Sequence, residues 1–207
     1  MKYKLTEETK EILGRTLHRI VCVTAFGSVS AGDVGGWVES EKNLDQSGNA
    51  WVYGDARVYG DARVYGNASV SGNARVYGDA WVYGDAWVYG NARVYGDARV
   101  YGNASVSGNA RVYGDAWVYG DAEVYGDARV SGNADFIVLK NNWSSGRCFT
   151  YTRSNEKWKV GCFYGTGAEL IAKAYNDSEL SGKCYEASVN YVESIYKILE
   201  EIKKNAD

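Results

Sequence analysis

Residues 74–85 read ARVYGDAWVYGD, two copies of a six-residue unit with the consensus Ala-x-Val-Tyr-Gly-Asp/Asn. The unit repeats from Ala50 to Ala134 without a change of phase, and valine recurs every six residues from Val52 to Val130. Alternation along a strand directs Ala and Val to one side and x and Tyr to the other. Gly with Asp or Asn then forms a corner, because these residues adopt left-handed backbone angles at low cost. A single unit buries too little to be stable alone, so the repeat predicts a β-solenoid whose stacked units share one core.

The segment before the repeat predicts a small β cap. Residues 3–5 and 17–23 are strand-like and flank a polar turn that carries Gly14. Val38 and Leu44 lie six residues apart, which is the spacing of the valines in the repeat. We therefore expect the solenoid to begin before its consensus becomes regular, as an atypical terminal coil does.

The segment after the repeat changes character and predicts a mixed α+β cap. Its apolar, β-branched and aromatic runs indicate short strands, and the last two are joined by a turn at residues 154–155. Two amphipathic stretches follow and indicate a short and then a longer helix. The expected strands are 136–139, 148–152 and 158–163, and the expected helices are 168–175 and 185–203.

The predicted fold class is mainly β, a parallel β-helix of about five coils with a cap at each end. We divide the chain into an N-terminal β cap at 1–37, a β-helix at 38–134 and a C-terminal α+β domain at 135–207. The chain holds 25 Gly and no Pro, which suits a solenoid, because Gly forms corners and Pro would interrupt strand pairing.

Composition and charge exclude some functional classes. The formal net charge is −3, which argues against general nucleic-acid binding. No apolar run reaches the ~20 residues needed to cross a bilayer, and the start, MKYKLTEETKE, lacks the apolar centre of a signal peptide. The four cysteines have no CxxC spacing, so we expect reduced thiols in a cytoplasmic protein, with a Cys148–Cys162 disulfide as the alternative.

The phase of small, apolar and Gly-Asp/Asn positions resembles the hexapeptide-repeat left-handed β-helix superfamily. That resemblance implies a left-handed helix in which three units make one triangular coil of 18 residues. The leader AGDVGGWVE at 31–39 and the segment GCFYGT at 161–166 resemble a group of bacterial and bacteriophage repeat proteins. A shared fold does not carry an activity, so function has to come from the surface.

With 18 residues per coil, the outward residues sort into three columns, each a face of the solenoid. The arginine face carries Arg57, Arg75, Arg93, Arg111 and Arg129 beside Tyr59, Tyr77, Tyr95 and Tyr113. The tryptophan face carries Arg63, Trp81, Arg99 and Trp117 beside Tyr65, Tyr83, Tyr101 and Tyr119. The third face carries Trp51, Ser69, Trp87, Ser105 and Glu123 beside Tyr53, Ser71, Tyr89, Ser107 and Tyr125.

The arginine face predicts a site for an anion that bears a planar group, because guanidinium groups hold phosphates and aromatic rings stack on bases. The alternative is structural: Arg stacks on Tyr, and the corner aspartates neutralise it. Trp81 and Trp117 predict a partner-binding or self-association surface, since Trp, Tyr and Arg anchor interfaces. The alternative there is that stacked rings only stabilise neighbouring coils. Enzymes of the resembled superfamily are commonly trimers, so a homo-oligomer, with a trimer favoured, is expected.

Catalysis has weak support in the sequence. Acyltransferases of the resembled superfamily use a histidine as general base, and this chain has one histidine, His18, outside the repeat. A lone strand histidine is more often structural. No cluster suggests a metal site, and no phosphate-binding loop follows the glycines, so we expect neither metal nor cofactor.

The sequence therefore favours a non-catalytic binding protein over an enzyme, encoded by a phage or mobile element and located in the bacterial cytoplasm. It would bind a host protein or sequester a nucleotide-like anion, as a counter-defence protein does. The alternatives are a hexapeptide-type acyltransferase that uses His18 and a structural virion component.

Overall fold

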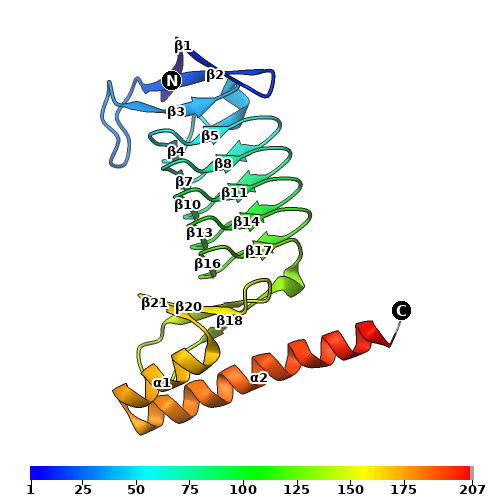
Figure 1. Cartoon of the computed structure of the whole chain (residues 1–207). Helices are drawn as coiled ribbons and strands as arrows, with labels where there is room; N and C mark the ends of the chain where they lie inside the picture. Colours follow the sequence, from blue (N-terminus) through cyan, green and yellow to red (C-terminus); the bar gives the residue numbers. More distant parts are fainter. Residues whose placement is uncertain (206–207) are drawn as a thin grey trace. The chain divides into compact units, whose positions relative to one another are not determined.

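The computed structural model describes residues 1–205, and its contacts divide the chain into two compact units. The first unit spans Met1–Asn133, and the second begins at Ala134. The first is a parallel β-solenoid of about five left-handed coils preceded by antiparallel strands, as predicted (Figure 1).

The first unit opens with an antiparallel hairpin whose strands are β1 (Tyr3–Ile12) and β2 (Arg15–Cys22). Strand β3 (Val34–Val38) pairs antiparallel with β2 on one side and parallel with β5 (Arg57–Val58), the next strand in the sheet, on the other. The hairpin therefore extends one sheet of the solenoid. A short 3₁₀ helix, η1 (Glu41–Asn43), follows β3.

Fourteen two-residue strands build the coils, and each of β4 to β14 pairs in parallel with the strand three units further along. This pairing sets the coil at 18 residues, because Val58 lies opposite Val76. The arginine face is the sheet that continues to β8, β11, β14 and β17, the tryptophan face is the sheet of β6, β9, β12 and β15, and the third face is the sheet of β4, β7, β10, β13 and β16. The strands are β4 (Trp51–Val52), β5 (Arg57–Val58), β6 (Arg63–Val64), β7 (Ser69–Val70), β8 (Arg75–Val76), β9 (Trp81–Val82), β10 (Trp87–Val88), β11 (Arg93–Val94), β12 (Arg99–Val100), β13 (Ser105–Val106), β14 (Arg111–Val112), β15 (Trp117–Val118), β16 (Glu123–Val124) and β17 (Arg129–Val130).

The bore of the solenoid is filled by the alanines and valines of the repeat from Ala50 to Val130, all of which are buried. Val38 and Leu44 are also fully buried and pair with Val58 and Val64 of the next coil. The prediction that the solenoid begins before its consensus is therefore confirmed. Small and branched apolar side chains pack closely along the axis, which gives the short strands a shared core that none could form alone.

The corners depend on glycine in the left-handed region. Gly84 has φ +70°, and a Cβ added there would lie 3.0 Å from the backbone nitrogen of Gly102 in the next coil. The following Asn or Asp side chains form hydrogen bonds between coils, for example from Asn67 to Asp85 and from Asn103 to Asp121, both at 3.0 Å. At this corner, Asn donors thus separate carboxylates that would otherwise repel across one coil spacing.

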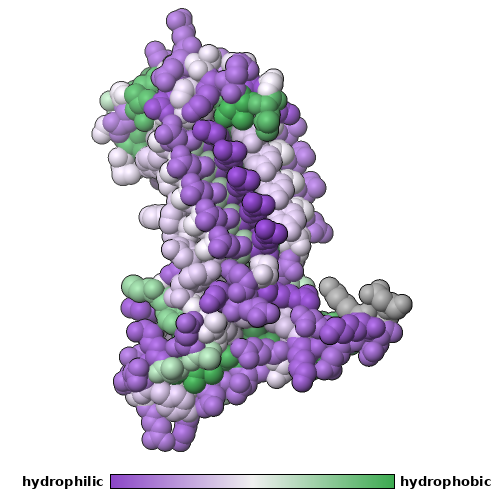
Figure 2. Space-filling view, in the orientation of Figure 1, coloured by the Kyte–Doolittle hydropathy of each residue, from purple (hydrophilic) through white to green (hydrophobic). Residues whose placement is uncertain are grey.

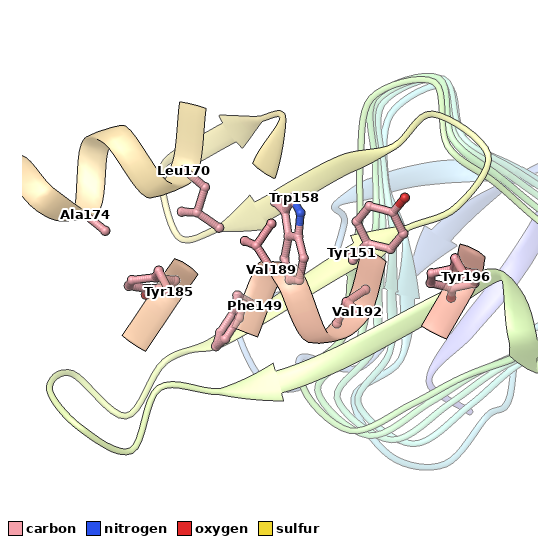
Figure 3. Close-up of a cluster of buried hydrophobic side chains, with 9 residues drawn as sticks. All are labelled: Phe149, Tyr151, Trp158, Leu170, Ala174, Tyr185, Val189, Val192 and Tyr196. Atoms are coloured by element: carbon pink, nitrogen blue, oxygen red, sulfur yellow. The ribbon is translucent and has the colours of Figure 1, made fainter. Parts of the chain in front are cut away.

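The second unit is an antiparallel sheet packed against two helices (Figure 3). Its core joins Trp158 and Phe149 of the sheet to Leu170 of the first helix and to Val189 and Val192 of the second. The prediction of one strand over 158–163 is wrong, because Gly161, with φ +52°, turns the chain between two shorter strands. The elements are β18 (Phe136–Lys140), β19 (Cys148–Thr152), β20 (Lys157–Val160), β21 (Phe163–Gly165), α1 (Gly167–Asp177) and α2 (Glu179–Lys204).

The four cysteines are free thiols, and Cys148 and Cys162 are not bonded to each other. Of the helices between residues 1 and 205, neither is both long and apolar enough to cross a bilayer.

Close contact between coils at the corners predicts different costs for two glycine substitutions. Gly120 has φ +65° but open space around an added Cβ, so Gly120→Ala should lower the free energy of unfolding by about 1 kcal/mol through backbone strain alone. Gly84→Ala should cost about 2–4 kcal/mol, because its Cβ also meets the backbone of Gly102. Urea denaturation measures both, and equal losses would show that the coils are not in contact at this corner.

Candidate functional site

The arginine face brings its five predicted arginines into one column. Strand register places Arg57 opposite Arg75, and the same pairing continues through Arg93 and Arg111 to Arg129. Neighbouring strands of a sheet lie about 4.8 Å apart, so the positive charges recur at that spacing. Figure 2 shows the column as the most hydrophilic part of this side of the solenoid, over β5, β8, β11 and β14.

Within the part of the chain that the structure describes, no hydrogen-bond, ion-pair or cation–π partner is found for the side chains of Arg57, Arg75, Arg93 and Arg111. The Nε atom of Arg57 is buried without an acceptor. Like charges placed opposite each other on adjacent strands are destabilising. The predicted alternative, in which Arg stacks on Tyr and corner aspartates neutralise it, is therefore not found for these four side chains.

The predicted tyrosines of this face form a continuous stack. Ring centroids are 5.1 Å apart for Tyr59 and Tyr77, 5.0 Å for Tyr77 and Tyr95, and 5.2 Å for Tyr95 and Tyr113, with planes within 8° of parallel. Each ring covers its neighbour, so the column offers edges and hydroxyls to a ligand rather than open ring faces. Burial raises the pKa of Tyr59 and of Tyr77, with Arg75 and Arg93 among the charges that oppose the rise, and the hydroxyls therefore stay protonated as donors.

The column lines a hollow of about 550 Å³ at its N-terminal end, with Leu13 and Arg15 of the hairpin turn on its rim. Two of its charges are paired internally, Arg15 with Glu39 at 2.9 Å and Asp61 with Lys42 at 2.8 Å. The charges left facing the hollow are then the guanidinium groups of Arg75 and Arg93 and the carboxylate of Asp79, an excess of one positive charge. The residues that line the hollow are Leu13, Arg15, Tyr59, Gly60, Asp61, Arg75, Tyr77, Gly78, Asp79 and Arg93.

The sequence did not identify the hairpin as part of this site. Strand register continues the arginine column to Trp37 and then to Arg19, whose guanidinium carbon lies 4.8 Å from the centre of the Trp37 ring. Ile12 and Leu17 of the hairpin pack against the cluster that contains Tyr59. The hairpin has no hexapeptide phase, and its pairing contains irregular register shifts, so no periodic signal could place it over the column.

On the tryptophan face, the arginine side chains form cation–π contacts with tryptophan rings of the same face. The guanidinium carbon of Arg99 lies 5.1 Å from the ring of Trp81 and 4.9 Å from that of Trp117, and that of Arg63 lies 5.8 Å from Trp81. Alternating Arg and Trp therefore form a cation–π column, each contact worth about 0.5–1 kcal/mol at a surface. Trp117 is 41% exposed.

The third face carries the most exposed aromatic side chain of the solenoid. Trp87 is 59% exposed, and its neighbours in the column are Ser69 and Ser105. Trp51 of the same column is instead buried in contact with Tyr3 and Phe26.

His18 lies outside the hollow of the arginine face. It pairs with Val38, in the column of core valines and not in that of the arginines, and its Nδ1 lies 3.2 Å from the main-chain oxygen of Thr6. Among residues 1–205, no group of three or more His, Cys, Asp or Glu side chains could hold a metal ion.

These features define the class of protein, a solenoid of hexapeptide coils. The repeat matches the family model described as the YdcK beta solenoid repeat, over residues 56–72, 70–84, 86–108 and 104–120. The predicted resemblance to hexapeptide-type β-helix repeats is therefore confirmed.

A similarity to one curated protein concerns part of the chain. "Uncharacterized acetyltransferase YdcK" of Escherichia coli (strain K12) is 35% identical over 60 residues, which cover 25% of this chain and 18% of that protein. The chain thus matches less than a fifth of the length of that relative.

The contrast between the two arginine-bearing faces predicts that replacing an arginine by glutamine has opposite effects on stability on the two faces. Arg93→Gln should raise the free energy of unfolding by about 0.5 kcal/mol at low salt, because repulsion from Arg75 and Arg111 is removed. Arg99→Gln should lower it by about 1 kcal/mol, because two cation–π contacts are lost.

Urea denaturation at low salt and at about 1 M salt, where the Debye length is about 3 Å, measures both effects. The gain for Arg93→Gln should disappear at high salt. A loss of stability for Arg93→Gln at low salt would show that this arginine has a structural partner.

Proposed function

We propose that the protein is a non-catalytic binding protein whose arginine face holds an anionic ligand. The observation that carries this proposal is the column of four in-register guanidinium groups without internal partners. Such a column costs stability in the free protein, and an anion bound along it would remove the repulsion. Protonated tyrosine hydroxyls beside the column would add hydrogen-bond donors for the same anion.

The occupant that fits this chemistry is a phosphate-bearing compound or an acidic surface of a host protein. Guanidinium groups bind phosphate and carboxylate oxygens in pairs, and repeated spacing suits a ligand with more than one anionic group. Phage or mobile-element origin, a cytoplasmic location and a role against host defence remain predictions from the sequence. The expected homo-oligomer also remains a prediction, with exposed Trp87 as the side chain that self-association would cover.

Tripolyphosphate, a linear anion without a ring, tests the proposal directly. It should raise the melting temperature of the wild-type protein, since a ligand at 100 times its Kd stabilises by about 2.7 kcal/mol. Arg75→Ala with Arg93→Ala should abolish the rise, and Arg93→Ala alone should reduce it. Arg99→Ala is the matched control, an equal loss of charge one unit further along the chain, and should retain the rise. A wild-type protein that tripolyphosphate does not stabilise would contradict anion binding.

Acyl transfer is the second candidate function, and the similarity to the Escherichia coli protein named as an acetyltransferase favours it. His18 would be its general base. Its contact with the Thr6 carbonyl and its pairing with Val38 point to a structural role instead. We therefore rank acyl transfer below anion binding as the function of this protein.

Acetyl-CoA separates the two functions. If the protein only binds anions at the arginine face, any stabilisation by acetyl-CoA should persist in His18→Ala and should be lost in the Arg75→Ala, Arg93→Ala variant. Release of free CoA thiol in the presence of small amine or hydroxyl acceptors should stay at the uncatalysed rate. Turnover that His18→Ala abolishes, in a variant with an unchanged melting temperature, would establish the acyltransferase.

A further inference from the structure

A second hollow, of about 590 Å³, lies at the start of the tryptophan face and is not part of the arginine face. It exists because the repeat has not yet become regular in the preceding coil. The register there is 20 residues, because Leu44 pairs with Val64, so Asp45 lies opposite Tyr65 and Asn43 lies opposite Arg63, and neither carries a ring or a guanidinium group. The hollow is thus the space that a tyrosine and an arginine would fill in a regular coil.

The floor of this hollow is the end of an aromatic stack. Tyr65 stacks on Tyr83 with ring centroids 4.8 Å apart and planes 2° from parallel, and Tyr83 stacks on Tyr101 at 4.9 Å. One face of Tyr65 is covered by Tyr83, and its side toward the start of the chain has no ring to cover it. Trp81 stands edge-on to Tyr65, with centroids 6.1 Å apart, and forms a wall.

The equivalent end of the stack on the arginine face is closed. Tyr59 is 5% exposed, because Leu17 and Trp37 pack in the same cluster. Tyr65, by contrast, is partly exposed where it lines its hollow, whereas Tyr59 lines the hollow of the arginine face with a nearly buried ring.

The polar groups around the hollow carry both signs of charge. Glu41 and Asp45 supply carboxylates, and Arg63 and Lys42 supply cations, of which Lys42 is held by Asp61 at 2.8 Å. With Lys42 paired, the two carboxylates exceed the guanidinium of Arg63 by one negative charge, which disfavours an anionic ligand. The mixture of acceptors and donors suits a neutral ring whose edge carries both, and the volume lies within the range of small-molecule sites.

We propose that this hollow binds a planar heteroaromatic compound, with its ring stacked on Tyr65 as the next member of the tyrosine column. Carboxylates of Glu41 or Asp45 would accept hydrogen bonds from amino groups of the ring edge, and Arg63 would donate to its ring nitrogen or oxygen atoms. The site does not depend on the arginine face.

Adenosine, a neutral nucleoside, is the probe, and ribose is the control without a ring. Saturation-transfer NMR should detect the adenine ring protons on the wild-type protein, and calorimetry should give the affinity, with no binding of ribose. Tyr65→Ala should weaken binding by about tenfold or more, the contribution of one stacked base. Tyr101→Ala, in the middle of the same stack, is the matched control and should bind as the wild type does.

Asp45→Tyr provides a second variant that leaves the existing stack intact. It places a ring opposite Tyr65 in the preceding coil and should block adenosine in a protein that still unfolds cooperatively. The Arg75→Ala, Arg93→Ala variant should still bind adenosine, which separates this site from the anion site. The proposal is overturned if the wild type does not bind adenosine at millimolar concentration, if Asp45→Tyr binds it unchanged, or if Tyr101→Ala weakens binding as much as Tyr65→Ala.

Discussion

The structure of the first unit depends on the parallel pairing of strands that lie 18 residues apart. Each coil contributes only three strands of two residues, and no such strand is stable alone. Pairing places the backbone of each strand between two copies of itself, and it places Ala and Val of every unit against Ala and Val of the next. One geometric condition thus provides both backbone hydrogen bonding and core packing: every coil pairs with the next in the same register.

The same condition determines the surface, because each outward residue meets its own equivalent in the next coil. For tyrosine this is favourable, and the rings stack. At the corner of Asn67 and Asp85, Asn donates to Asp of the next coil and so moderates the repulsion between carboxylates. For Arg57, Arg75, Arg93 and Arg111 it is unfavourable, and no ion pair or cation–π contact within the described residues offsets it. The tryptophan face avoids this repulsion by alternating Arg with Trp.

Hollows form where the periodicity is broken. On the arginine face, the hairpin turn at Leu13 forms the rim of a column that would otherwise be a uniform surface. On the tryptophan face, the irregular coil around Glu41–Asn43 lacks the side chains that would cover Tyr65. Regular coils supply columns of identical groups, and the irregular N-terminal coil supplies the concave surfaces that a ligand needs. Both candidate sites therefore lie at the N-terminal end of the repeat.

The six-residue periodicity alone determined the solenoid, its buried Ala and Val and its glycine corners, because these follow from local alternation and a constant phase. The membership of each face needed in addition the coil of three units that the family resemblance implied. Tertiary structure decided what the periodicity does not encode. The hairpin strands carry no repeat, so only folding placed Arg15 beside Tyr59 and closed one stack while leaving that of Tyr65 open. Likewise, the apolar run 158–163 gave no sign of its break at Gly161, whose left-handed backbone depends on the sheet around it. Whether an arginine has a partner is also a tertiary property, because it depends on distances between coils and not on the order of residues.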